Sequence, residues 1–260
     1  MQLSLNFGAS APAGPSLTHL HQRLLSAFGP FRSDLRHEPL DQLVKSLISS
    51  RTHDEESQAT YERLKHRYPQ WSAVLDAPPE ELRSLLCPVT YPDEKADWLS
   101  VALRQIVSKT GVLSLDFLAD QPVEQAAAWL SRLSGVGPKV AAAVLNFSTL
   151  RMRVMVVDTH VLRLAKRYGL VSPSATAEAA SRIMMNLAPD SWTAADFYEL
   201  HWLMKRTGQM RCTHGWARCG ACPLAAACAR QDVPERTNVA RLHFAKAMRP
   251  SSDTRHGRAR

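Results

Sequence analysis

Apolar side chains recur along most of this chain at intervals of three and four residues, the spacing of one face of an α-helix. Leu20, Leu24 and Leu25 follow it in the first predicted helix. Further helices are predicted from Leu40 to Ile48, at 54–67, from Pro78-Pro79-Glu80 onward, and at 93–108, 122–133, 139–147, 159–168, 175–187 and 194–207. A β-like run at 154–157 is too short and isolated to imply a sheet. The pattern predicts an all-α protein of about ten helices.

The ends of the chain lack this periodicity. Residues 1–15 are rich in Ala, Gly, Pro and Ser, so we expect a disordered N-terminal segment, with order beginning near Leu17. Residues 233–260 form a basic tail in which a few apolar side chains predict at most one short helix. Asp54 stands where a helix begins and is predicted to cap it.

Composition narrows the class of partner. The 260 residues carry a formal net charge of +8, which favours a polyanion such as nucleic acid, or else an anionic membrane surface. Part of the excess positive charge lies in the basic tail, whose side chains could simply be solvated without binding a partner. No apolar run approaches the length of a bilayer span, so we expect a soluble protein without a membrane partner.

Four cysteines, Cys212, Cys219, Cys222 and Cys228, lie within seventeen residues. Four thiolates this close can converge on one inorganic centre, either tetrahedral zinc or a four-iron cluster. Two disulfides are disfavoured because no apolar signal sequence is present and disulfides are rare in reducing cytosol. A single CxxC flanked by lone cysteines favours a loop around something larger than one ion, but the spacing leaves the metal open. Cys87, in an apolar stretch, is predicted to be buried.

A second motif, Leu133-Ser134-Gly135-Val136-Gly137-Pro138-Lys139, separates two predicted helices. Glycine permits a positive φ and lets a phosphate approach the backbone, while proline suits the first position of the next helix. The free N–H groups of such a turn can bind one DNA phosphate without reading sequence. An ordinary turn between helices is the alternative.

The segment Val156-Val157-Asp158-Thr159-His160 follows this hairpin and precedes the cysteines. In this order, over approximately residues 17–230, the motifs resemble the endonuclease III branch of the helix-hairpin-helix DNA glycosylases. The resemblance implies a [4Fe-4S] cluster on the four cysteines, and double-stranded DNA with a damaged or mismatched base as the partner. It also places the hairpin residues Gly135, Val136 and Gly137, together with His160, at the DNA.

The resemblance assigns the nucleophile to Lys139 and the essential carboxylate to Asp158. The amine would attack C1′ of the target deoxyribose, displace the base and leave a Schiff base that permits β-elimination. An ionised Asp158 would stabilise positive charge on the sugar and help to deprotonate the lysine. More simply, Lys139 could only neutralise a phosphate and Asp158 could only cap a helix, although capping and catalysis are compatible.

Two further residues are assigned by position. The loop 88–93 resembles the family's wedge, with Tyr91 filling the gap that a flipped nucleotide leaves in the duplex. Arg51 stands where endonuclease III usually has a glutamine that contacts the orphaned base. Surface packing of Tyr91 and phosphate binding by Arg51 are the alternatives. Ser134 also replaces a common proline, and the interval from Lys139 to Asp158 is one residue longer than in endonuclease III.

The implied architecture is a two-domain helix-hairpin-helix glycosylase fold. A six-helix barrel spans residues 36–150, and an iron-sulfur cluster domain combines 16–35 with 151–232. We expect a monomeric, cytoplasmic, bifunctional glycosylase and AP lyase that removes damaged pyrimidines, nucleoid-associated if the protein is bacterial. Residues 198–212 also resemble plant 5-methylcytosine glycosylases of the Demeter type, so uracil, mismatched thymine or 5-methylcytosine are alternative substrates. The alternatives are a monofunctional enzyme of the same superfamily, and a non-catalytic iron-sulfur DNA-binding or redox-sensing module.

Overall fold

The computed structural model describes residues 16–31, 33 and 36–233 of the chain. The predictions for residues 1–15 and for the tail from 234 onward lie outside this part. The described residues form ten α-helices: α1 (Leu17–Phe28), α2 (Pro39–Ile48), α3 (Asp54–Arg67), α4 (Pro79–Leu86), α5 (Pro92–Thr110), α6 (Val123–Leu130), α7 (Pro138–Phe147), α8 (Thr159–Tyr168), α9 (Ala177–Leu187) and α10 (Ala194–Met210). The prediction of an all-α protein is therefore confirmed.

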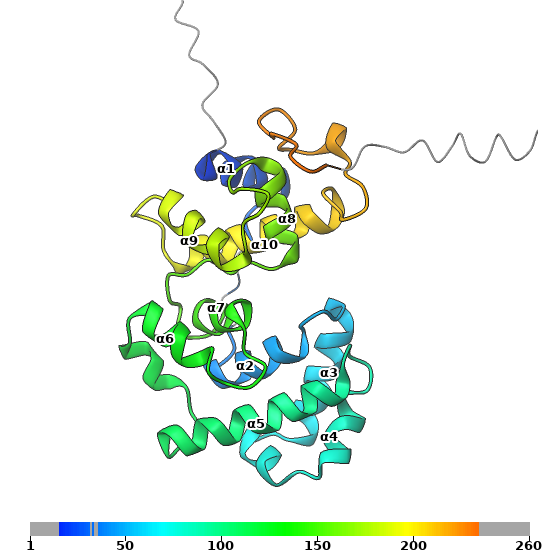
Figure 1. Ribbon diagram of the computed structural model, residues 1–260, viewed down its shortest axis with the longest axis vertical. Helices are drawn as coiled ribbons and strands as arrows, with labels where there is room; N and C mark the ends of the chain where they lie inside the picture. The colour runs from blue at the N-terminus through cyan, green and yellow to red at the C-terminus, as the bar shows by residue number, and fades with distance from the viewer. Residues whose placement is uncertain (1–15, 32, 34–35, 234–260) are drawn as a thin grey trace, which may run out of the picture.

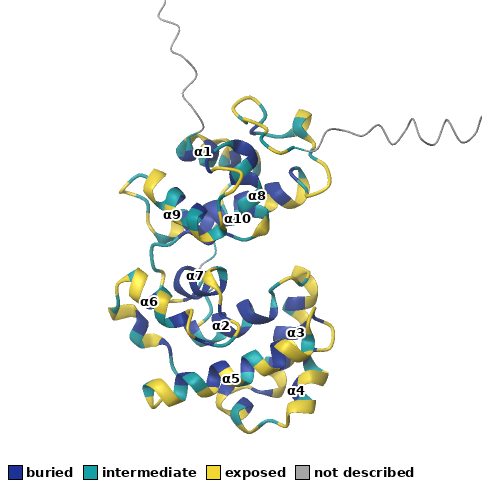
Figure 2. Cartoon of the chain, viewed as in Figure 1, coloured by how far each residue is buried: buried dark blue, intermediate teal, exposed yellow. Residues whose placement is uncertain are grey.

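The helices form two groups, each with its own apolar core (Figure 1 and Figure 2). Helices α2 to α7 bury one large cluster that runs from Leu43 to Leu145. Helices α1, α8, α9 and α10 bury a second one, in which Leu20 and Leu24 of α1 pack with residues from Met155 onward. The first helix of the chain thus belongs with the last ones, because its apolar face is covered by α10.

Helix α7 lies at the junction of the two groups (Figure 1). It packs on α2 and α6 on one side and contacts α9 and α10 on the other. The buried Asn146 ties the junction, because its side-chain amide donates to the carbonyls of Met152 and Ala194 at 3.0 Å each. The C-terminal end of α7 is therefore tied to the start of α10 and to the segment that follows α7.

The predicted bounds hold to within three residues wherever capping residues mark them. Helix α5 begins at Pro92, in the first turn where the missing N–H is tolerated, and ends at Thr110, with Gly111 as its C-cap at φ 78°. Helix α6 is shorter than predicted and ends before Ser131, since the chain turns into the hairpin there. Three short 3₁₀ segments, Trp71–Asp76, Asp116–Asp120 and Cys219–Ala221, were not predicted.

Two local expectations are decided by the fold. The run 154–157 belongs to no regular element and pairs with no strand, and within the described part of the chain only isolated β-bridges occur. Cys87 is exposed, so the prediction that it is buried was wrong; it follows α4 as the C-cap, on the outer side of the apolar stripe. None of the helices in the described residues has the length and apolarity of a membrane span.

Candidate active site

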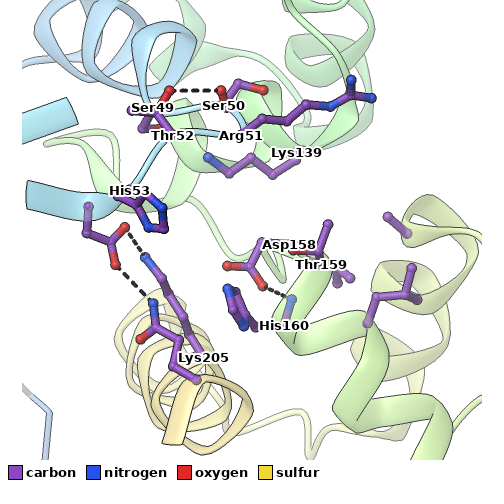
Figure 3. A pocket seen from close by; sticks show the side chains of 15 residues that line it. Ser49, Ser50, Arg51, Thr52, His53, Lys139, Asp158, Thr159, His160 and Lys205 are labelled. Carbon is purple, nitrogen blue, oxygen red and sulfur yellow. Dashed lines mark hydrogen bonds and ion pairs between the residues drawn. The ribbon is translucent and has the colours of Figure 1, made fainter. Parts of the chain in front are cut away.

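A cavity of about 510 Å³ opens between the two groups of helices (Figure 3). Its walls come from the turn after α2, the N-terminal ends of α3, α7 and α8, and one face of α10. Both Lys139 and Asp158 line it, although nineteen positions separate them in the chain. Arg51 and His160 line the same cavity. The structure therefore brings four of the sequence-predicted site residues together.

Lys139 is the second residue of α7, directly after Pro138. The proline fixes the first turn, so the lysine side chain leaves the helix end toward the cavity (Figure 3). Burial lowers the pKa of Lys139, Asp158 acts in the opposite direction, and Lys205 lowers the pKa further. A larger fraction of Lys139 is consequently a neutral amine, the form that can act as a nucleophile.

Asp158 is the N-cap of α8. Its Oδ1 accepts hydrogen bonds from the backbone N–H groups of His160 and Val161, each at 2.8 Å. Burial acts to raise the pKa of Asp158, whereas His201 in its protonated form, the Val161 N–H, His160 and Lys205 act to lower it, and the pKa falls below its usual value. The capping alternative is thus present in the structure. It engages Oδ1 and leaves Oδ2 outside the cap.

Two imidazoles flank the carboxylate. His201, on α10, is buried and its Nδ1 lies 2.9 Å from the carbonyl oxygen of Val156, which makes Nδ1 the protonated nitrogen. Burial lowers the pKa of His201 to about 4. Burial also lowers the pKa of His160, whose Nδ1 accepts from the Arg163 guanidinium at 3.1 Å. Both rings are therefore mainly neutral at pH 7.

Lys205, on α10, is a second lysine of the cavity, and no motif in the sequence singles it out. Its Nζ lies 2.7 Å from Oδ1 of Asp54, and the Gln209 amide donates to Oδ2 of Asp54 at 3.1 Å. The prediction that Asp54 caps a helix was wrong, because His53 is the N-cap and Asp54 is the first helical residue. Its carboxylate instead pairs across the cavity, 151 residues along the chain.

Arg51 lies in the turn after α2 with φ 55°. This turn is held by Lys95 of α5, whose Nζ is buried and donates to the carbonyls of Ile48 and Ser50 and to Oγ1 of Thr52 at 2.7 to 2.8 Å. A positive charge at the end of α2 suits the negative end of the helix dipole. The buried amine of Lys95 therefore fixes the part of the cavity wall that carries Arg51.

Tyr91 lies outside the cavity lining, beside this wall. It precedes α5 with φ 57°, and 47% of it is exposed. Thr90 joins the two loops, because its backbone N–H donates to Oγ1 of Thr52 and its hydroxyl donates to the carbonyl of Arg51. The two residues assigned to the gap in the duplex are thus adjacent and project from one joined surface.

The hairpin residues Gly135, Val136 and Gly137 also lie outside the cavity lining, on the approach to α7. Gly135 alone takes the expected left-handed conformation, with φ 72°, and a Cβ there would lie 2.7 Å from Cβ of Trp98. Gly137 is extended, with φ −90° and ψ 178°, and acts as the N-cap of α7. Val136 is buried, so only the backbone of the turn is available to a ligand.

The four cysteines line one small cavity beneath α8, outside the active-site cavity. Arg163 and Arg167 of α8 hold this loop: the Arg163 Nε donates to the Cys212 carbonyl at 2.7 Å, and the Arg167 Nη1 donates to the Thr213 carbonyl at 2.6 Å and lies 3.4 Å from Sγ of Cys212. Burial raises the pKa of Cys222 and of Cys228, and the other thiols of the set add to this effect.

An all-thiolate set fits zinc or iron-sulfur chemistry, since soft ligands select these metals. Among the described residues, however, no three His, Cys, Asp or Glu side chains are gathered closely enough to hold a single metal ion. The loop therefore places the four thiols around a shared space without presenting the compact ligand shell of one ion.

The family model described as HhH-GPD superfamily base excision DNA repair protein matches residues 44–190. A putative DNA glycosylase from Arabidopsis thaliana is 35% identical over 136 residues, which cover 52% of this chain and 46% of the relative. The endonuclease III-like protein 1 of Gallus gallus is 27% identical, over 69% of this chain and 60% of its own length. This chain thus spans about half the length of the curated relatives that it matches.

The fold also matches solved structures. A trapped endonuclease III-DNA covalent intermediate has a TM-score of 0.68 at 21% identity, covering 82% of this chain and 94% of that one. A thermostable thymine-DNA glycosylase has a TM-score of 0.66 at 18% identity, covering 82% and 95%. At these identities the likeness concerns the fold.

Proposed function

Because the chain belongs to the HhH-GPD superfamily of base excision DNA repair proteins, within its endonuclease III branch, we propose that it is a DNA glycosylase with an associated AP lyase activity. One observation carries the proposal: the amine of Lys139 and the carboxylate of Asp158 line one cavity at the junction of two helical groups. Its substrates are damaged pyrimidines in duplex DNA.

In the proposed reaction the neutral amine of Lys139 attacks C1′ of a flipped nucleotide. The C1′–N bond breaks, the base leaves with the bonding electrons, and the resulting amine adduct opens to a Schiff base. Loss of a C2′ proton then expels the 3′ phosphate by β-elimination. Burial supports this role, because it favours the uncharged form of the lysine at the start of the reaction.

Asp158 is proposed to stabilise the positive charge that develops on the sugar as the base departs. The lowered pKa keeps the carboxylate ionised, and the two N–H bonds at Oδ1 fix its orientation. Asp158 can also accept the proton that Lys139 loses.

The cavity admits a nucleotide only after it has left the base stack. Tyr91 is proposed to fill the vacated space, with Arg51 beside the orphaned base, and the Gly135–Gly137 turn to bind a phosphate of the same strand. The joined loops support this division, since they hold both side chains next to the cavity mouth. We further propose that the protein acts as a cytoplasmic monomer.

We propose that Cys212, Cys219, Cys222 and Cys228 hold a [4Fe-4S] cluster. The cavity that the four thiols share and the preference of soft thiolate ligands for iron-sulfur chemistry support this proposal. When bound, the cluster would crosslink the loop that carries Trp216 and Arg218, an exposed pair suited to the DNA backbone.

Borohydride trapping tests the proposal, because reduction of an imine gives a covalent protein-DNA adduct. Duplexes would carry thymine glycol, dihydrouracil, uracil, a G:T mismatch or 5-methylcytosine. We expect an adduct with the wild type on an oxidised or reduced pyrimidine, and none with Lys139→Ala. Lys109→Ala, an exposed lysine of α5 away from the cavity, is the control and should trap like the wild type.

The outcomes separate the rival functions. Base release without an adduct would identify a monofunctional enzyme, in which water attacks C1′ and Lys139 binds phosphate. DNA binding without base release, unchanged in Asp158→Asn, would identify a non-catalytic module. Preference for uracil, mismatched thymine or 5-methylcytosine would retain the chemistry and replace the substrate class.

A further inference from the structure

The active-site cavity holds a charged pair that the proposed reaction does not use. Lys205 enters from α10, and its ammonium lies 2.7 Å from the carboxylate of Asp54 on α3 (Figure 3). Only 13% of the Lys205 side chain is exposed, whereas 58% of the Asp54 side chain is. The cation is therefore on the cavity side of the pair and the anion on the solvent side.

The position of Lys205 is fixed by more than this pair. Its Nζ lies 4.8 Å from the centre of the Trp202 ring, one turn back on α10. Gln209, one turn further on, donates to the second oxygen of Asp54 at 3.1 Å. The Asp54 carboxylate thus binds two residues of α10, and these contacts keep the Lys205 ammonium at the cavity wall.

We propose that Lys205 is a positioning residue, a second cation held in the cavity by Asp54 so that the amine of Lys139 is kept neutral. This inference rests on the proposed function of Lys139. Two amines in one enclosed space repel each other when both carry a proton, so the fixed one favours loss of the proton from the other.

The balance of charges around Lys139 supports this role. The charged and ionisable groups around the lysine are Asp158 and His160 at the start of α8, His201 and Lys205 on α10, Asp54 on α3, Lys95 on α5, and Arg51 and His53 in the turn between α2 and α3. The imidazoles of His160 and His201 are mainly neutral at pH 7, which leaves the carboxylates of Asp158 and Asp54 against the cations Lys205, Lys95 and Arg51. Without Lys205 the balance of charges would shift toward the carboxylates and favour the protonated form of Lys139.

The same charges predict opposite effects for the two partners of the pair. Burial, the largest effect, and Lys205 lower the pKa of Lys139, whereas Asp158 and Asp54 raise it. Removing the Lys205 charge should therefore raise the pKa of Lys139, and removing the Asp54 charge should lower it. If the pair only joined α3 to α10, either substitution would break the same contact, and both should change the pKa of Lys139 in the same direction or leave it unchanged.

The test measures the pH dependence of Lys139 in four proteins: wild type, Lys205→Met, Asp54→Asn and the double variant. Acylation of Lys139 by acetic anhydride in DNA-free protein, quantified by peptide mass spectrometry, reports the neutral fraction of the amine. Borohydride trapping on an abasic-site duplex, under single-turnover conditions, reports Schiff-base formation. Lys205→Arg keeps the charge, and Arg206→Gln removes a neighbouring exposed cation outside the cavity.

We expect Lys205→Met to move the midpoint of both profiles to higher pH and to slow trapping at pH 6 roughly three- to tenfold. Asp54→Asn should move the midpoint to lower pH, and the double variant should lie between the single ones. Lys205→Arg and Arg206→Gln should follow the wild type.

The inference is overturned if Lys205→Met and Asp54→Asn move the acylation midpoint in the same direction, or if neither moves it. Thermal unfolding of each variant separates a lost fold from a changed profile. If the wild type forms no adduct at any pH, the proposed lyase function fails instead, while the acylation profiles still report whether Lys205 controls Lys139.

Discussion

The guanidinium of Arg51 lies 5.8 Å from the centre of the Tyr91 ring, and both residues have a left-handed backbone, with φ 55° and 57°. Neither arginine nor tyrosine favours this conformation, so the surrounding bonds must hold it. Lys95 and Thr90 supply those bonds from α5 and from the neighbouring loop. The pair is thus presented as a rigid projection at the cavity mouth, which suits insertion into a duplex.

Replacement of Tyr91 by alanine should slow base excision from duplex DNA roughly ten- to hundredfold, because stacking of a base on an aromatic ring is worth about 1–3 kcal/mol. The same base in a single strand needs no filled gap and should be affected much less. Tyr91→Phe keeps the ring and should remain near the wild type. Single-turnover excision on both substrates checks this, and equal losses on the two would contradict a wedge role.

Gly135→Ala should lower the free energy of unfolding by about 2–4 kcal/mol, since the residue has φ 72° and the added Cβ would overlap Cβ of Trp98. Gly137→Ala is the matched control in the same turn. Its φ is −90° and the added Cβ would meet nothing within 4 Å, so only the poorer capping by alanine remains and we expect a loss of about 1 kcal/mol or less. Urea denaturation measures both. Similar values for the two variants would refute the assigned geometry.

His201 should make the protein sensitive to mild acid. Its pKa falls from 6.5 to about 4 on folding, so between these values the unfolded chain binds the proton and the folded one does not. Stability is therefore retained above pH 6.5 and lost as the pH falls toward 4, by about 2 kcal/mol at pH 5. The His201→Gln variant should lose correspondingly less free energy of unfolding between pH 7 and pH 5. Identical losses in urea titrations would show that another group is responsible.

Cys219→Ser should remove iron and the brown colour of the purified protein if the cysteine loop holds a [4Fe-4S] cluster. Cys87→Ser is the control, because Cys87 is exposed on the other group of helices and lines neither cavity. Metal analysis and the visible spectrum provide the readout. Colourless wild-type protein containing zinc would replace the cluster with a zinc site.

Much of the fold follows from local sequence. Apolar residues at helical spacing, Pro92 and Pro138 at helix starts, and Gly111 at a helix end mark the elements because each acts within one or two turns of its own position. The short 3₁₀ segments escaped prediction, since they depend on packing between helices. Asp54 was misassigned for a similar reason: its strongest partner, Lys205, is remote in the chain.

The sequence by itself determined the helices, the order of the motifs and two of the residues proposed for the chemistry, Lys139 and Asp158, because short motifs carry that information. The tertiary structure alone decided that these two share a cavity, that Lys205 and Asp54 form an ion pair in it, and that Tyr91 stays outside it. Electrostatic and packing interactions depend on distance in space, and the placement of α10 against α7 and α8 sets those distances.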